Sequence, residues 1–385
     1  MAVNIRCGQW PEAVWSSGIA CGIKPSGRAD LAVLVGERPL GFAGVFTQNA
    51  ARAACVEWSQ SLVGLPVRAL IANSGNANAC TGDAGAHAVE ETAAAAAERV
   101  GCRPEEVVVA STGPIGVPLP VDKIVAALPT AIDALQRDAE PFARSLMTTD
   151  TFPKWSSVAN PRVAGVAKGA AMVAPNMATM LAFLVTDVPL ETAELQDVLA
   201  AAVDRTFNRI SIDACESTND SVMLFSTGTG STPAPDAFAR AVEEVCGELA
   251  RQIVLDAEGA TKFVRIAITG APDEAYATGV GRAVAASDLW RAALHGADPN
   301  WGRVLAAAGG FDRMLDLSRI EVALGDVTVF AGGEPRPDAN DAAGSVLRED
   351  DVTVHVSLGA GGASADILTA DLSPEYVKLN AFGTT

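Results

Sequence analysis

Apolar residues along the chain follow two patterns, and these patterns alternate from one end of the chain to the other. Two segments repeat apolar residues at the spacing of a helix face and predict helices over 190–207 and 236–259, and segment 85–101, which consists of helix formers and ends at a glycine, predicts a third. Shorter, continuously apolar segments predict strands, several of which end at a glycine-bearing turn. The predicted strands cover 31–37, 67–75, 105–113, 180–188, 262–270, 319–330 and 352–361. This alternation predicts an α/β or α+β architecture.

Composition and charge narrow the classes of partner. The 385 residues are 49% hydrophobic, which is enough for a large core and for two lobes, without requiring two domains. A formal net charge of -18 and the absence of a basic cluster argue against nucleic acid and against an anionic membrane surface as partners. The N-terminal segment has no basic region followed by an apolar core, and no apolar run reaches the roughly 20 residues of a membrane span. We therefore expect a cytoplasmic protein that acts on small molecules.

Cysteine and glycine patterns argue against several kinds of cofactor site. The seven cysteines include no C-x-x-C pair and the three histidines are scattered singly, which argues against a zinc site and a disulfide scaffold. Neither "GTGSTP" nor "GAGGAS" completes the dinucleotide fingerprint after a strand, and no P-loop motif is present. We expect no metal and no bound cofactor.

The junction of Ala178 and Thr179 places a hydroxyl at the entrance of the apolar segment 180–188. A Thr hydroxyl needs a neighbouring base to act as a nucleophile, and an N-terminal Thr has one in its own α-amine, whose ordinary pKa is about 7.7–8.0. An internal Thr gains that amine if its hydroxyl attacks the preceding carbonyl and water opens the ester. Ala178 leaves the carbonyl uncrowded, and Pro175 restricts the local backbone. An isolated Ala-Thr pair is more often an ordinary strand entrance, so the junction needs support from elsewhere.

That support comes from a set of segments in a fixed order. Segment 167–181, "AKGAAMVAPNMATML", resembles the cleavage segment of the ornithine acetyltransferases, also called glutamate N-acetyltransferases. The resemblance extends over nearly the whole chain, through segments 71–82, 111–116, 145–154, 206–221, 256–263, 295–307 and 376–385.

The resemblance implies a fold, a processing step and a reaction. The implied fold is a layered αββα sandwich of the self-processing kind, unrelated to Rossmann proteins. Self-cleavage at Ala178-Thr179 is implied to produce chains 1–178 and 179–385, two copies of each forming a heterotetramer. Thr179 then carries an acetyl group from N-acetylornithine to glutamate in arginine biosynthesis, and the Thr112 hydroxyl and the Gly113 N–H form the oxyanion hole. Whether acetyl-CoA is a further acetyl donor stays open.

The resemblance also implies a set of substrate-binding residues. Lys168 and Glu258 match family positions that contact the substrate, and their opposite charges suit the carboxylate and ammonium groups of an amino acid. Asn380 and Thr385 match the family's C-terminal pattern, which suggests that the tail folds over the pocket.

Several points about the substrate stay open. One Thr within 148–151 is expected to bond to the substrate; Thr148 is the choice, and Thr151 is the next. Pro114, Ala171 and Gly383 differ from the residues usual in the family. An acetyltransferase for another amino acid, in specialised metabolism, is therefore an alternative.

Two further alternatives belong to other functional classes. An N-terminal-nucleophile aminopeptidase or amidase would share Thr179 and the oxyanion hole but would let water take the acyl group. A catalytically silent amino-acid-binding protein would be expected to lack Thr179 or Thr112, whereas this chain has both.

Overall fold

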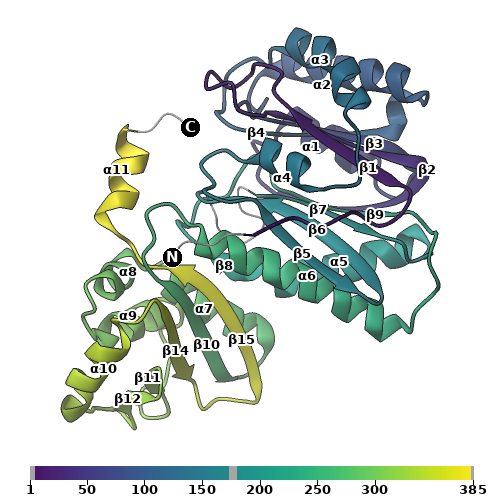
Figure 1. Ribbon diagram of the computed structural model, residues 1–385. Coiled ribbons are helices and arrows are strands. Elements are labelled where there is room, and N and C mark those ends of the chain that lie inside the picture. The colour runs from purple at the N-terminus through teal and green to yellow at the C-terminus, as the bar shows by residue number, and fades with distance from the viewer. Residues whose placement is uncertain (1–4, 173–179, 383–385) are drawn as a thin grey trace. The chain divides into compact units, whose positions relative to one another are not determined.

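The computed structural model describes residues 5–172 and 180–382, which form two compact units (Figure 1). The first unit comprises the chain up to Asn208 together with Cys215–Asp256. The second comprises Arg209–Ala214 and the described residues from Ala257 to Phe382. The predicted cleavage junction and Thr385 lie outside the described residues.

The first unit is built on an eight-stranded sheet with strand order β4-β3-β2-β9-β7-β6-β5, in which β1 also pairs with β2. Its strands are β1 (Val14–Ile19), β2 (Leu31–Phe46), β3 (Val67–Ser74), β4 (Val107–Thr112), β5 (Lys154–Ala159), β6 (Arg162–Lys168), β7 (Leu181–Thr186) and β9 (Ser221–Ser226).

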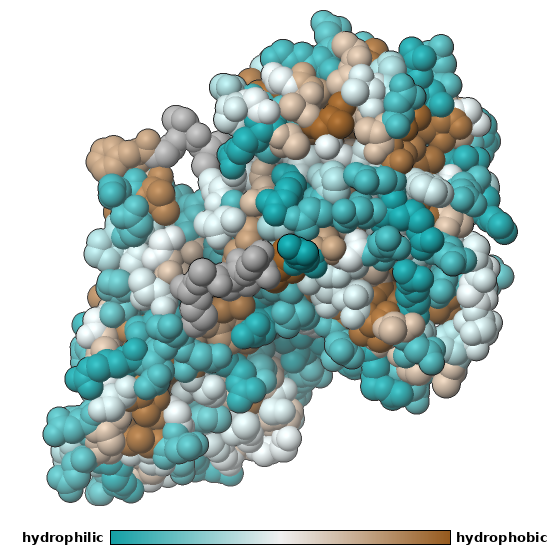
Figure 2. All heavy atoms as spheres, viewed as in Figure 1, coloured by the Kyte–Doolittle hydropathy of each residue, from teal (hydrophilic) through white to brown (hydrophobic). Residues whose placement is uncertain are grey.

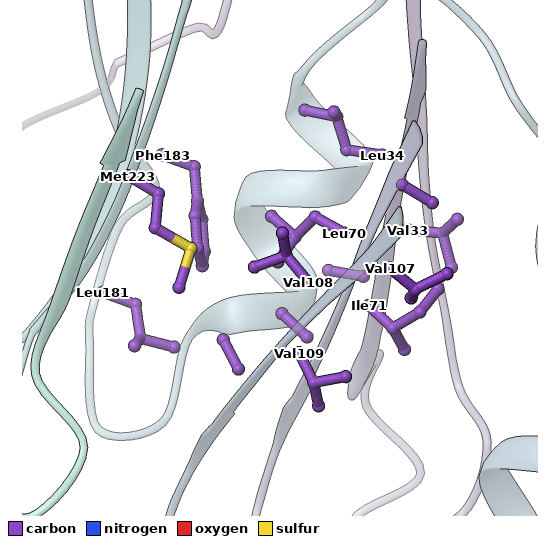
Figure 3. Packing of buried hydrophobic residues seen from close by; sticks show 14 of the residues in the cluster. Val33, Leu34, Leu70, Ile71, Val107, Val108, Val109, Leu181, Phe183 and Met223 are labelled. Carbon is purple, nitrogen blue, oxygen red and sulfur yellow. The ribbon is translucent and has the colours of Figure 1, made fainter. Parts of the chain in front are cut away.

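The long strand β2 links two halves of this sheet. Its first part pairs with β1 and β3, and its last part, from Gly41 to Phe46, pairs with β9. The two halves share one hydrophobic core. Figure 3 shows Phe183 and Met223, from β7 and β9, directed toward Leu70 and Val108 of β3 and β4. Burial of these side chains holds the halves together.

Helices cover the outer faces of both halves. Helices α2 and α3 pack on the half that contains β3 and β4, whereas α6 packs on β5 and β6 beside α5 (Figure 1). The resulting αββα layering confirms the predicted sandwich. The helices of this unit are α1 (Ala54–Ser61), α2 (Gly82–Val100), α3 (Val121–Asp133), α4 (Glu140–Leu146), α5 (Thr192–Arg205) and α6 (Pro235–Leu255).

The second unit contains a seven-stranded sheet with strand order β13-β12-β11-β14-β10-β15-β8. Alternating valines in β14 are buried in its core, as expected of a strand with one covered face. Helix α7 packs on β10 and β15, and helix α11 has no buried residue. The strands are β8 (Ile210–Ser211), β10 (Phe263–Ala271), β11 (Glu321–Leu324), β12 (Val327–Ala331), β13 (Glu334–Pro335), β14 (Asp351–Ser357) and β15 (Ala363–Ala370), and the helices are α7 (Glu274–Ala285), α8 (Asp288–His295), α9 (Trp301–Phe311), α10 (Asn340–Val346) and α11 (Pro374–Phe382).

All the predicted strands and helices are present, with one refinement. Segment 319–330 forms two strands, β11 and β12, because Gly325 adopts a positive φ of 56° and reverses the chain. On the face seen in Figure 2, hydrophilic residues predominate and hydrophobic residues occur in small groups. None of the helices in the described part of the chain is long and apolar enough to cross a membrane.

Candidate active site

Thr112 and Gly113 lie where β4 ends against the turn that follows β3. The buried Thr112 accepts hydrogen bonds at its carbonyl from the N–H groups of Gly75 (2.8 Å) and Asn76 (3.1 Å). Gly113 has a φ of 145°, and a Cβ at this position would lie 2.3 Å from the Asn76 nitrogen. Only glycine fits here without a shift of the backbone, so the conformation of the predicted oxyanion pair is closely fixed.

Buried asparagines hold the turn after β4 in place. Asn76 Nδ2 donates to the carbonyls of Val117 (3.1 Å) and Pro118 (3.2 Å). Asn219 Nδ2 donates to the carbonyl of Ser111 at 2.8 Å, directly before Thr112. The asparagines of segments 71–82 and 206–221 therefore support the predicted oxyanion hole from two sides.

Lys168 reaches the same place from β6. Its buried Nζ lies 3.5 Å from the Thr112 hydroxyl oxygen, within hydrogen-bonding distance. In the sheet, Lys168 is paired with Leu181 at the start of β7. The structure thus brings Thr112 and Lys168 together at the strand that begins two residues after Thr179, whereas Thr179 itself lies outside the described residues.

A buried carboxyl group fixes the first described residue after the predicted cut. Asp220 Oδ1 accepts from the N–H of Met180 at 2.9 Å. Burial raises the pKa of Asp220 well above its ordinary value, although the Met180 N–H and the charge of Lys168 oppose this shift. Sequence reasoning did not single out Asp220, which lies within the matched segment 206–221.

The two threonines considered for substrate binding have different surroundings. The half-buried Thr148 donates its N–H to Asp150 Oδ2 at 3.0 Å, and its hydroxyl makes no hydrogen bond to any described residue. The Thr151 hydroxyl instead donates to the carboxylate of Asp256. Of the two hydroxyls, that of Thr148 therefore still has its proton to donate to a ligand, whereas the Thr151 hydroxyl can only accept.

Glu258 and Asn380 meet in the second unit. Asn380, on α11, donates from Nδ2 to Glu258 Oε2 at 2.9 Å and to the carbonyl of Tyr376 at 3.0 Å. The predicted site residues thus fall into two groups: Thr112, Gly113, Thr148 and Lys168 in the first unit, and Glu258 and Asn380 in the second. Thr385 lies outside the described residues.

The described residues contain no group of three or more His, Cys, Asp or Glu side chains that could hold a metal ion. They do contain a buried ionic cluster of Asp150, Lys154 and Asp256, which sequence reasoning missed. These residues lie in the matched segments 145–154 and 256–263. The only signal for Asp150 and Lys154 in the sequence was their position on either side of a threonine, an aromatic residue and a proline, which also describes an ordinary exposed turn.

Comparison with known proteins decides the family. The model of the ArgJ family matches residues 15–385. The chain belongs to the ArgJ family. The arginine biosynthesis bifunctional protein ArgJ of Thermus thermophilus is 43% identical over 379 residues, which cover 97% of this chain and 99% of that relative. The protein of the same name from Streptomyces coelicolor is 44% identical over 372 residues, 95% of this chain and 96% of the relative.

A solved ArgJ structure agrees with the fold. The crystal structure of arginine biosynthesis bifunctional protein ArgJ from Bacillus halodurans is similar, with a TM-score of 0.50 and 34% identity. The match covers 52% of this chain and 97% of that chain.

Proposed function

We propose that this member of the ArgJ family transfers the acetyl group of N-acetyl-L-ornithine to L-glutamate, giving L-ornithine and N-acetylglutamate. Its relatives over nearly the full length are named arginine biosynthesis bifunctional proteins. The observation that carries the proposal is the approach of Lys168 to the Thr112 hydroxyl beside the entrance of β7. There, a hydrogen-bond donor for an oxyanion and a cation for a substrate carboxylate lie next to the strand that follows Thr179.

The reaction proceeds in two halves through an ester on Thr179. The free α-amine of Thr179 takes the hydroxyl proton as the oxygen attacks the acetyl carbonyl. Both tetrahedral intermediates are stabilised by the Thr112 hydroxyl and the Gly113 N–H, which are donors whose positions are set before the reaction begins. Ornithine leaves after the first half, and the amine of glutamate takes the acetyl group in the second.

Cleavage between Ala178 and Thr179 creates the required amine. The junction lies in the segment between β6 and β7, which are adjacent antiparallel strands paired along their length. These backbone hydrogen bonds would keep the two products together after the cut. The solved Bacillus halodurans chain matches about half of this chain over nearly its whole length. A chain of that length is expected for one product of a cut near the middle.

The proposed substrate-binding residues are those that the family resemblance assigns. Lys168 binds the substrate carboxylate, and Thr148 donates or accepts with its available hydroxyl. Glu258, held by Asn380, suits the substrate's ammonium group. Thr385 is counted among the substrate-binding residues because it matches the family's pattern. Acetyl-CoA is proposed as a second acetyl donor because the relatives are named bifunctional, and a heterotetramer of two copies of each chain is proposed as the assembly.

An exchange assay tests the function. Purified protein is incubated with N-acetylornithine and glutamate, and ornithine, N-acetylglutamate and acetate are quantified together. Equal amounts of ornithine and N-acetylglutamate are expected. Acetate formed in place of N-acetylglutamate would indicate a hydrolase. When other amino acids are supplied in place of glutamate, acetyl transfer to one of them and not to glutamate would indicate a different acceptor.

A further inference from the structure

We propose that Asp150 is a positioning residue for the acetyl-transfer site, held in place by a buried ionic cluster with Lys154 and Asp256. This inference rests on the proposed function, because it concerns the geometry of Thr148 and Lys168. The cluster lies entirely within the first unit.

One carboxylate connects two chain segments that are proposed to bind substrate. Asp150 Oδ2 accepts from the N–H of Thr148 (3.0 Å), and Oδ1 accepts from the N–H of Gly169 (2.7 Å), directly after Lys168. Oδ1 also accepts from Lys154 Nζ at 2.7 Å. The side chain is fully buried, so water does not compete for these bonds. A change at Asp150 would therefore move both segments relative to each other.

Lys154 and Asp256 fix the carboxylate itself. Lys154, the fully buried first residue of β5, places Nζ 2.7 Å from Asp150 Oδ1 and 2.6 Å from Asp256 Oδ2. Asp256 follows α6 and also accepts from the N–H of Thr151 at 3.0 Å. The cluster thus ties the turn of residues 148–151 to β5 on one side and to the end of α6 on the other.

The charge of Asp150 is maintained by its neighbours. Burial raises the pKa of its carboxyl. The ammonium groups of Lys154 and Lys168 and the Gly169 N–H lower the pKa by more than burial raises it, so the pKa lies below its ordinary value. The carboxylate therefore stays ionised and lies within electrostatic reach of Lys168. Buried ion clusters are often no more stabilising than apolar packing, whereas breaking one leaves an unpaired charge. A role in geometry accounts for this cluster better than a role in stability.

The test compares Asp150→Asn with Gln252→Leu. Asn has nearly the same volume as Asp but one carbonyl oxygen in place of two acceptors, so the bond to Thr148 or to Gly169 is lost in either orientation of the amide. Gln252 is a matched control: it is buried on α6 and bonds to the N–H (3.0 Å) and carbonyl (2.9 Å) of Trp155, one residue after Lys154. It joins the same helix and strand without a hydrogen bond to either proposed substrate segment.

For Asp150→Asn, kcat/KM for N-acetylornithine is expected to fall on the order of 10²-fold, mainly through a higher KM, because about 1 Å of misplacement has an effect of that size. Gln252→Leu is expected to stay within about threefold of wild type when the two variants are compared at equal folded fraction. Asp256→Asn, which keeps the Asp150 bonds to Thr148 and Gly169, is expected to give an intermediate rise in KM.

Amide hydrogen exchange provides a readout that does not depend on the reaction. Peptides covering residues 147–151 and 168–170 should exchange faster in Asp150→Asn than in wild type, and should be unchanged in Gln252→Leu. Equal kcat/KM in the two variants, or unchanged exchange in Asp150→Asn, overturns the inference. If the wild-type protein does not transfer acetyl groups, the proposed function fails. The hydrogen-exchange rates of the two peptides still decide whether Asp150 links the two segments.

Discussion

At the scale of single residues, the proposed chemistry depends on how firmly the donors are placed. The Thr112 carbonyl is held by two N–H groups of the β3 turn, and its hydroxyl lies beside Lys168 Nζ. A donor fixed in this way needs no rearrangement when negative charge develops on the substrate oxygen. Its contribution should therefore appear in the rate of the chemical step more than in substrate binding.

Replacement of Thr112 tests this expectation. Thr112→Ala should lower kcat by about 10²–10³-fold with little change in KM, because one oxyanion donor is lost while the Gly113 N–H remains. Thr112→Ser keeps a hydroxyl at the same position and should recover much of the rate. Steady-state kinetics on the three proteins, each first shown by mass to be cleaved, decide the question. Equal impairment of the Ser and Ala variants would show that the methyl group or the turn is what matters.

Asp220 gives a prediction for the pH dependence of stability. Burial raises its pKa, so the folded protein keeps a proton that the unfolded chain loses above about pH 4. This contribution to wild-type stability is present below about pH 4 and is lost as the pH rises toward the folded-state pKa. Asp220→Asn has no such loss. The Tm difference between Asp220→Asn and wild type should therefore increase with pH, from about pH 4 toward the folded-state pKa of Asp220, by the equivalent of about 1.4 kcal/mol per pH unit. A Tm difference that does not depend on pH would contradict the prediction.

At the scale of elements, the sequence predicted most strands with strong apolar signals but missed the apolar strand β9, and it also missed strands made of small or polar residues. Strands β5 and β6 read "KWSSVA" and "RVAGVAK", which carry little β signal. They form because β6 pairs with β7 and because α6 packs closely on both. A Cβ on Gly165 would lie 3.1 Å from side-chain atoms of both Val245 and Leu249 of α6. This strand therefore needs small residues because the helix packs closely against it. Lys168, at the end of β6, was therefore found only through its motif.

The turn after β4 offers a test at the same scale. Gly113→Ala would place a Cβ 2.3 Å from the Asn76 nitrogen, at a backbone φ that Ala avoids. We expect a loss of about 1–3 kcal/mol in stability and a marked fall in kcat/KM, because the turn that carries the donor must shift. Gly116→Ala is the matched control, since its φ of 81° is also positive but its Cβ would meet no atom within 4 Å. Thermal unfolding and kinetics should show the smaller effect at Gly116, and equal effects would contradict the explanation.

At the scale of the whole molecule, the predicted cut and the compact units do not coincide. The first unit contains strands from both sides of residue 179, so each predicted chain contributes to its sheet. The apolar pattern alone predicted a mixed α/β protein, and the family resemblance added the αββα layers. The division into units depends on which strands pair across long sequence separations, such as β2 with β9, and no local pattern encodes such a pairing.

The same limit applies to the candidate site. Resemblance could assign Thr112, Lys168, Glu258 and Asn380 because each lies in a recognisable segment. It could not identify the cluster centred on Lys154, because the meaning of those charges depends on complete burial, which only the folded chain shows. The residues missed are those that hold the proposed substrate-binding residues in place.

The central claim is that a cleaved chain carries the acetyl group on Thr179. The most direct measurement is the intact mass of the denatured protein, quenched shortly after mixing with N-acetylornithine in the absence of glutamate. We expect two fragments, residues 1–178 and 179–385, with one acetyl group on the second fragment, and loss of that group when glutamate is added. Thr179→Ala should remain a single full-length chain without an acetyl group. An active wild-type preparation that contains only the full-length, unacetylated chain would contradict the account.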